Sequence, residues 1–379
     1  MKTFSKIMAL ALVFVCCVSA FAACGGGSNE FIIGGSGPLT GANSEYGTAV
    51  YNGAMIAINE INEKGGLNGV TFKLDMRQDD CTALGAENAY NSLYAAGMKA
   101  SIGSVTSGSA EAFANSAKED NIICMTPSAS ADPVIATGNH SFRVCFGDPQ
   151  QGSLAADEMV TNKDYKKIGV IYDESDTYST GLYEAFAARM TALNKVKGTD
   201  YVVYTFNEDS NKDFNVQVTE IKNAGCDAIF LPIYYGEAAL ILKAAAAIGF
   251  NAPVLGCDGL DGLAGELDNT VTAEIRYITP FDVNNADEKI AAFVAKYEAA
   301  YGEKPNQFAA DGYDAVMIIY EAMKAGNVDP AADAATITDA LIAVLTGGTF
   351  KYTGVTGSDM TWETSGSCDK AATIVTIAH

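Results

Sequence analysis

The chain has 379 residues, of which 46 are acidic and 24 are basic, so its formal net charge at pH 7 is −22. Such a chain offers no basic stripe that could neutralise phosphates, which argues against a nucleic-acid-binding protein. Apolar residues make up 49% of the sequence, enough to form the cores of two domains of ordinary size.

The first residues are typical of an export signal rather than of a folded domain. Two lysines precede an apolar run over 7–18, which is too short to span a bilayer and fits the central part of a signal peptide. Small residues follow up to Cys24, and this ending resembles a bacterial lipobox, in which the cysteine becomes the lipidated first residue. We therefore expect a signal peptide over 1–23, and a lipidated Cys24 with a flexible tether over 24–30. Plain secretion without lipidation is the alternative.

The first predicted unit of the fold is an apolar strand over 31–33, a turn rich in glycine and serine, and a helix that begins near 44–46. Apolar residues three and four positions apart give this helix one buried face. The turn therefore lies at the carboxyl end of a strand and the amino end of a helix, where free N–H groups and the helix dipole favour an anionic group.

The same unit recurs along the chain. Further strands are expected over 70–76, 100–105, 122–125, 142–146, 167–172, 201–206, 228–233, 253–255 and 275–279, with helices between most of them. Three helices over 288–301, 308–324 and 336–345 follow, and strands over 350–355 and 372–377 close the chain. Alternating strands and helices predict parallel sheets covered by helices on both faces.

We therefore expect an α/β protein with two similar doubly wound lobes, each with a central parallel sheet, linked by a hinge. One lobe would cover 31–147 plus 281–354, and the other 148–280 plus 355–379. Because open α/β sheets bind ligands at the carboxyl ends of their strands, the ligand site would lie between the lobes.

Six cysteines lie beyond the export segment: Cys81, Cys124, Cys145, Cys226, Cys257 and Cys368. Their spacing fits no zinc site, and the sequence alone does not choose between the many possible disulfide pairings. Several of them lie in or beside apolar strands, where small buried thiols are common, so mostly free thiols are expected.

Two hydroxyl-rich turns follow neighbouring strands of the first predicted lobe, over 106–109 and 126–130. Parallel strands would bring these turns together, and their hydroxyl and backbone N–H groups suit a carboxylate. Either turn alone is explained by N-capping of the next helix. The pair favours a binding role.

Asp258 follows an apolar strand and could bind an ammonium group from across a cleft. It could equally be a turn residue that bonds its own backbone. Four tyrosines at strand ends or helix starts could line an apolar pocket while offering hydroxyl groups. They are Tyr46, Tyr178, Tyr234 and Tyr235.

Enzyme classes find little support in the sequence. The glycine-rich stretch over 35–41 departs from the spacing of a dinucleotide-binding loop. No G-x-S-x-G elbow occurs, and a catalytic triad would need one of the two histidines, His140 or His379. Acidic pairs such as Asp79-Asp80 lack the spacing of a metal-binding loop. We expect no enzyme activity, no cofactor and no bound metal.

Short motifs of one protein family recur over nearly the whole mature chain, in that family's order. The first are Gly37-Pro-Leu-Thr-Gly-Ala with Tyr46-Gly, Ala57-Ile-Asn-Glu-Ile-Asn with Gly65-Gly, Asp79-Asp80-Cys81, Ile102-Gly103, Thr126-Pro-Ser-Ala, Phe142-Arg143 and Gln150-Gln-Gly. The later ones are Ile171-Tyr-Asp173, Tyr178-Ser-Thr-Gly181, Tyr234-Tyr235 and Gly256-Cys-Asp-Gly259. As a set, they resemble the leucine/isoleucine/valine-type, or type I, periplasmic solute-binding proteins of ABC importers.

The resemblance implies two lobes that close on a ligand. By position, Ser107, Ala129 and Ser130 would hold the ligand's carboxylate, and Asp258 would bind its amine. The residues that would line the side-chain pocket are Tyr46, Val105, Thr106, Tyr178 and Tyr234 or Tyr235. Asp258 is shorter than the glutamate of leucine-type members, and Thr106 replaces a cysteine that can pair with the one matching Cys81, so that disulfide is not expected.

The resemblance further implies a lipid-anchored extracytoplasmic receptor, periplasmic or on the cell surface. It would bind a small amino acid of branched-chain or other apolar type and deliver it to an ABC permease in the membrane. We expect a monomer without nucleic-acid partners. The alternative is the same fold binding an amide or a small carboxylate, in which case Asp258 would be a structural turn residue.

Overall fold

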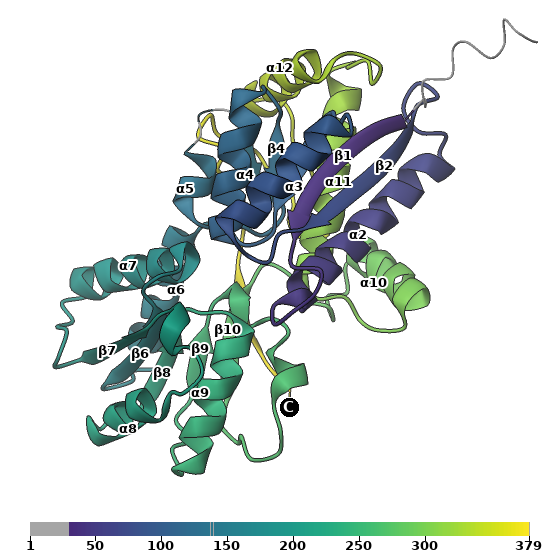
Figure 1. Ribbon diagram of the computed structural model, residues 1–379. Helices are drawn as coiled ribbons and strands as arrows, with labels where there is room; N and C mark the ends of the chain where they lie inside the picture. The colour runs from purple at the N-terminus through teal and green to yellow at the C-terminus, as the bar shows by residue number, and fades with distance from the viewer. Residues whose placement is uncertain (1–29, 137, 139, 379) are drawn as a thin grey trace, which may run out of the picture.

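The computed structural model describes residues 30–136, 138 and 140–378, which form two α/β lobes (Figure 1). The first lobe holds a five-stranded sheet of order β2-β1-β3-β4-β5, in which all paired strands are parallel. The second holds a six-stranded sheet of order β11-β10-β9-β8-β6-β7, in which only β11 is antiparallel to its neighbour. The expected signal peptide and the Cys24 lipidation site lie outside the described residues.

The strands of the first lobe are β1 (Glu30–Gly37), β2 (Thr71–Gln78), β3 (Ala100–Ser104), β4 (Cys124–Thr126) and β5 (Ser141–Arg143). Its helices are α2 (Ser44–Glu63), α3 (Ala83–Ala95), α4 (Ser107–Glu119), α5 (Asp132–Ile135), α10 (Glu288–Tyr301), α11 (Gln307–Ala325) and α12 (Ala334–Thr346). β3 and β4 are buried along their whole length, as expected of central parallel strands with helices on both faces.

The strands of the second lobe are β6 (Ile168–Asp173), β7 (Tyr201–Phe206), β8 (Ala228–Leu231), β9 (Val254–Gly256), β10 (Ile275–Thr279) and β11 (Thr373–Thr376). Its helices are α6 (Asp148–Asp157), α7 (Thr177–Ala192), α8 (Asn215–Asn223) and α9 (Tyr235–Ala247), and α6 continues into the π-helical turn η1 (Glu158–Asn162). Short 3-10 turns complete it: η2 (Glu208–Ser210), η3 (Asp258–Leu260) and η4 (Leu263–Glu266).

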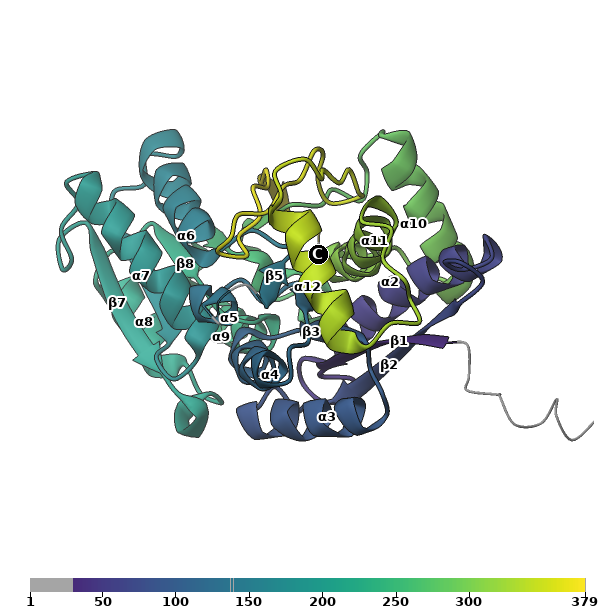
Figure 2. The ribbon, with the colours of Figure 1, turned by 90° about the horizontal axis from the view of Figure 1, so that it is seen from above.

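Helices α2 and α11 lie side by side on one face of the first sheet (Figure 2). Glycines make this close approach possible, because a Cβ at Gly53 would lie 1.8 Å from the carbonyl oxygen of Ala309. A Cβ at Gly312 would likewise lie 2.4 Å from the carbonyl oxygen of Val50. Helix α11 is buried almost all round. Its first residue, Gln307, donates from its backbone N–H to Asp261 of the second lobe at 2.9 Å.

The last segment before β11 stays attached to the first lobe. The backbone N–H groups of Val355 and Thr356 donate to the carboxylate of Asp314 on α11, at 3.1 and 2.9 Å. The indole of Trp362 donates to the carbonyl oxygen of Arg143 at 2.9 Å. We therefore propose that the chain passes from the first lobe to the second for the last time after residue 368, rather than after residue 354 as expected from the sequence.

The expected strand over 350–355 is not formed, and only an isolated bridge between Tyr352 and Met360 occurs there. The Tyr352 hydroxyl donates to Asp314, so this segment is held by side-chain bonds rather than by a sheet. All six cysteines in the described part of the chain are free thiols. No helix within the described ranges has the length and apolar character needed to cross a membrane.

Candidate functional site

The two hydroxyl-rich turns meet at the carboxyl ends of β3 and β4, which are paired strands. The hydroxyl of Ser128 donates to the carbonyl oxygen of Val105 at 2.8 Å, and the N–H of Ala131 donates to the hydroxyl of Ser107 at 3.3 Å. Five predicted site residues lie in these turns and all are buried: Val105, Thr106, Ser107, Ala129 and Ser130.

N-capping does not account for these hydroxyl groups. Thr106 is the N-cap residue of α4, but its side chain makes no capping hydrogen bond. The N-cap residue of α5 is Ala131, which has no hydroxyl at all. The Ser130 hydroxyl is buried and has no hydrogen-bond partner. The Ser130 hydroxyl is therefore available to a ligand, whereas the hydroxyls of Thr106, Ser107 and Ser128 already bond neighbouring groups.

Asp258 lies in the second lobe, where β9 ends and η3 begins, and it is only 3% exposed. Its Oδ1 accepts a hydrogen bond from the hydroxyl of Tyr178 at 2.7 Å. Its backbone N–H donates to Oε1 of Gln151 on α6 at 3.0 Å. Burial raises the pKa of Asp258 to about 6, while hydrogen bonds from Tyr178 and Gln151 act in the opposite direction.

The four predicted tyrosines form one cluster that joins the lobes. The hydroxyl of Tyr46, on α2 of the first lobe, donates to the carbonyl oxygen of Gly259 at 2.5 Å and accepts from the N–H of Tyr235 at 3.1 Å. The ring of Tyr234 lies 5.7 Å from that of Tyr46 and stacks on that of Tyr178 at 4.9 Å. The lobes are thus closed on each other at this point.

The first turn of α6 connects the hydroxyl-rich turns with Asp258. The N–H of Asp148 donates to the carbonyl oxygen of Ser130 at 3.1 Å, and Gln151, one turn later, holds the backbone of Asp258. The structure therefore brings all ten predicted residues to one region between the lobes. Their part in binding stays a prediction.

Sequence reasoning missed three polar residues at this region: Asn43, Asp148 and Gln151. Each has buried polar atoms without a hydrogen-bond partner, as do the hydroxyls of Ser130 and Tyr234. Buried polar groups are normally paired, so a concentration of unpaired ones indicates where a polar ligand fits. The Gln150-Gln-Gly motif of the resemblance was the available signal for Gln151.

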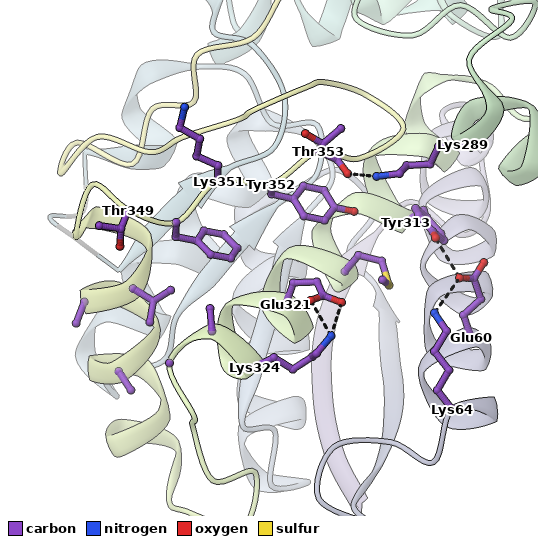
Figure 3. Close-up of a pocket in the computed structure, with 17 residues that line it drawn as sticks. Glu60, Lys64, Lys289, Tyr313, Glu321, Lys324, Thr349, Lys351, Tyr352 and Thr353 are labelled. Atoms are coloured by element: carbon purple, nitrogen blue, oxygen red, sulfur yellow. Dashed lines mark hydrogen bonds and ion pairs between the residues drawn. The ribbon is translucent and has the colours of Figure 1, made fainter.

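A larger cavity lies elsewhere, in the first lobe between α2, α11, α12 and residues 349–353 (Figure 3). It measures about 1180 Å³, but its charged groups already bind one another. Lys324 pairs with Glu321 at 2.9 Å, and the hydroxyl of Tyr313 donates to Glu60 at 3.2 Å. None of its described lining residues has a buried polar atom without a partner, so it gives no sign of a missing ligand.

Known proteins resemble the chain over nearly all of its described length. The family model described as periplasmic binding protein matches residues 30–378. A Leu/Ile/Val-binding protein of Rhizobium johnstonii is 30% identical over 311 residues, which are 81% of this chain and 83% of that protein. An amino acid binding protein of Pseudomonas aeruginosa is 31% identical over 338 residues, which are 87% of each chain.

Solved structures agree with this result. A leucine binding protein of Thermotoga maritima has a TM-score of 0.80 at 26% identity, covering 91% of this chain and 94% of its own. A branched-chain amino acid transporter substrate binding protein of Streptococcus pneumoniae, in complex with isoleucine, has a TM-score of 0.80 at 26% identity, covering 92% and 96%. The two-lobed fold predicted from the sequence is confirmed, and the chain belongs to the periplasmic binding protein family.

Proposed function

We propose that this chain is the extracytoplasmic solute-binding component of an ABC importer and binds a small amino acid, of branched-chain or other apolar type, between its lobes. The observation that carries the proposal is that the first turn of α6 links Ser130, in a hydroxyl-rich turn of the first lobe, to Asp258 of the second lobe, and that all of these residues are buried. The printed names of the relatives support the ligand class.

The two ends of the zwitterion would meet different chemistry. The free N–H groups at the start of α4 and the hydroxyls of Ser107 and Ser130 suit the carboxylate. The carboxylate of Asp258 suits the ammonium group, and the tyrosine cluster covers the apolar side chain. The protein does no covalent chemistry in this scheme, since the ligand acts by favouring the closed form of the two lobes.

Tyr46→Phe should weaken amino acid binding about five- to a hundredfold. The lost hydroxyl makes two hydrogen bonds between the lobes, to Gly259 and Tyr235, and each is worth about 0.5–1.5 kcal/mol. Isothermal titration calorimetry measures the change. Tyr90→Phe is the matched control, because the Tyr90 hydroxyl bonds Asp120 within the first lobe. Equal affinities for the two variants would contradict a role in closure.

Affinity should also fall as the pH decreases below about 6. Asp258 has a pKa of about 6 because it is buried, and only its ionised form attracts an ammonium group. Below this pH each binding event must release a proton, so affinity should fall about tenfold per pH unit. Burial also raises the pKa of the nearby Asp148, which would add to the loss. A dissociation constant that stays flat between pH 8 and 4.5 would contradict the role of Asp258.

A thermal-shift screen tests the ligand class itself. Stabilisation by amino acids alone supports the proposal, because a ligand that binds only the folded state raises the melting temperature. Stabilisation by amides or by small carboxylates without an amine would favour the alternative function. A solute binding protein from R. palustris, in complex with benzoate, has the same fold at 21% identity.

We also propose that Cys24 carries a lipid anchor and that the protein acts as a monomer beside its permease. Lipidation predicts that the mature protein partitions into detergent and that Cys24→Ser does not. Equal partition of both forms into water would refute the anchor. Light scattering of the soluble variant measures its mass, and a dimer would refute the monomer.

A further inference from the structure

An interlobe cavity of about 550 Å³ adjoins the proposed ligand site. It is lined by Ala131 of the first lobe, by the start of α6, and by the loop and first turns of α7 in the second lobe. Ala131 follows Ser130 directly. On the facing side, the hydroxyl of Thr177, which lines the cavity, lies 4.0 Å from where a Cβ of Gly108 would be, next to the first hydroxyl-rich turn.

The lining of this cavity is acidic, and none of its described residues is basic. Two of its acids have clear structural partners. Asp132 forms an ion pair with Arg143 at 3.1 Å, and Asp176 accepts a hydrogen bond from the N–H of Ser179 at 2.8 Å as the N-cap of α7. Asp148 differs from these two, because its carboxylate makes no hydrogen bond or ion pair with the described residues.

Asp148 is 2% exposed, yet neither oxygen of its carboxylate has a hydrogen-bond partner. The Ser130 hydroxyl is near enough to lower its pKa but makes no hydrogen bond of normal geometry with it. Arg143 is also nearby, but its guanidinium donates to the Ser130 carbonyl and to Asp132 instead. The first position of α6 is favourable for an acid because of the helix dipole, but this leaves both oxygens unpaired.

The carboxylate of Asp148 lies directly against helix α7, at Gly181. A Cβ at Gly181 of α7 would lie 2.4 Å from Oδ2 of Asp148, so only glycine at this position lets the carboxylate lie against the helix. Asp258 is tied to the same first turn of α6, because its N–H donates to Gln151, three residues after Asp148, at 3.0 Å. The charge of Asp258 also raises the pKa of Asp148. A buried unpaired carboxylate is costly unless a cation or donors reach it when the ligand binds.

We propose that Asp148 is a second acceptor for the ligand's ammonium group, which it shares with Asp258. The assignment rests on the proposed function and narrows the ligand class to primary amines. One oxygen of Asp258 already accepts from Tyr178, so this short side chain alone offers an ammonium group few free acceptors. With Asp148 and the Ser130 hydroxyl, all three N–H donors of a primary ammonium can be satisfied. N-Methylation or removal of the amine should therefore be strongly disfavoured.

The experiment titrates the whole mature protein by calorimetry with each of the twenty standard amino acids. The tightest binder, its N-methyl derivative and its deaminated carboxylic acid are then compared in the wild type and in Asp148→Asn. We expect Asp148→Asn to lose about ten- to a hundredfold in affinity for the amino acid, because charge-assisted hydrogen bonds are lost. Affinity for the deaminated acid should stay the same, so the preference for the amine should shrink.

Melting temperatures separate binding from folding. Asp148→Asn replaces a buried carboxyl group that has no hydrogen-bond partner, so the ligand-free variant should melt at the same temperature as the wild type or higher, while its ligand-induced shift becomes smaller. Glu184→Gln, on the same cavity, is the control and should keep wild-type affinity within about threefold.

The measurements distinguish a wrong role for Asp148 from a wrong proposed function. Full affinity of Asp148→Asn for the amino acid overturns the role of Asp148 and leaves the proposed function intact. An equal loss for the amino acid and for its deaminated acid also overturns it, because the residue would then be structural. A wild-type protein that binds none of the twenty amino acids overturns the proposed function and this role together.

Discussion

Lys370→Met should lower the free energy of unfolding by about 3–5 kcal/mol, as expected when one partner of a buried ion pair is removed. The Lys370 side chain is fully buried, and its ammonium group lies 3.1 Å from Oδ1 of Asp311. It also donates to the carbonyl oxygen of Val144 at 2.8 Å and to the hydroxyl of Thr356 at 2.7 Å. Without the ammonium group, Asp311 would be a buried acid with neither oxygen paired, since its Oδ2 already has no partner.

Urea denaturation of wild type and variants measures this loss. Asp311→Asn should also destabilise, because it leaves Lys370 as an unpaired buried cation. The double variant Asp311→Asn with Lys370→Met should recover part of the loss, since no charge is then left unpaired. Lys166→Met is the surface control, because its pair with Asp164 is exposed. A Lys370→Met variant within 1 kcal/mol of wild type, roughly the value of a surface pair, would contradict the prediction.

The same lysine also contacts α6 through its backbone. Its side chain bonds only groups of the first lobe and its boundary, whereas its carbonyl oxygen accepts from the side chain of Gln150 on α6 at 2.8 Å. Burial raises the pKa of Asp311 to about 7, and Lys370 is the main group that opposes this shift. We therefore expect Lys370 to hold the proposed last crossing of the chain against the first lobe.

The strand–turn–helix pattern predicted most of the fold, because apolar runs and turn residues can be recognised from short stretches of sequence. β3 and β4 are short apolar runs bounded by turn residues, and their order along the chain is enough to bring the two turns together. The start of α7 at Thr177 is also set locally, because the side chain of Asp176 accepts from the N–H of Ser179 and caps the helix.

Features that depend on distant partners were not predictable from local pattern. The apolar run over 350–355 looks like a strand, but Asp314, some forty residues earlier, bonds this segment's N–H groups and replaces a sheet partner. Asp148 looks like an ordinary acid at a helix start. Its proposed role in binding rests on its burial, on its unpaired oxygens and on the nearby Asp258. The residues next to it in the sequence predict none of these.

Asp258→Ala should abolish measurable amino acid binding while the protein stays folded. Truncating one side of a buried, hydrogen-bonded charge pair costs about 2–5 kcal/mol, which corresponds to roughly thirty- to several-thousandfold in affinity. The fold should persist because Asp258 holds no ion pair in the described structure, and Tyr178 would still accept from the N–H of Gly259. Calorimetry with the amino acids that stabilise the wild type, together with the melting temperature, tests both parts.

Asp261→Asn is the matched control for Asp258→Ala. Asp261 lies three residues further along the same loop, and burial also raises its pKa to about 6. Its carboxylate, however, accepts from the N–H of Gln307 at 2.9 Å instead of facing the tyrosine cluster. If general loss of negative charge near the hinge weakened binding, both variants would lose affinity alike. If Asp258 binds the ammonium group, only Asp258→Ala should lose affinity, and unchanged affinity in that variant would refute its role, because the carboxylate that bonds Tyr178 would then be dispensable.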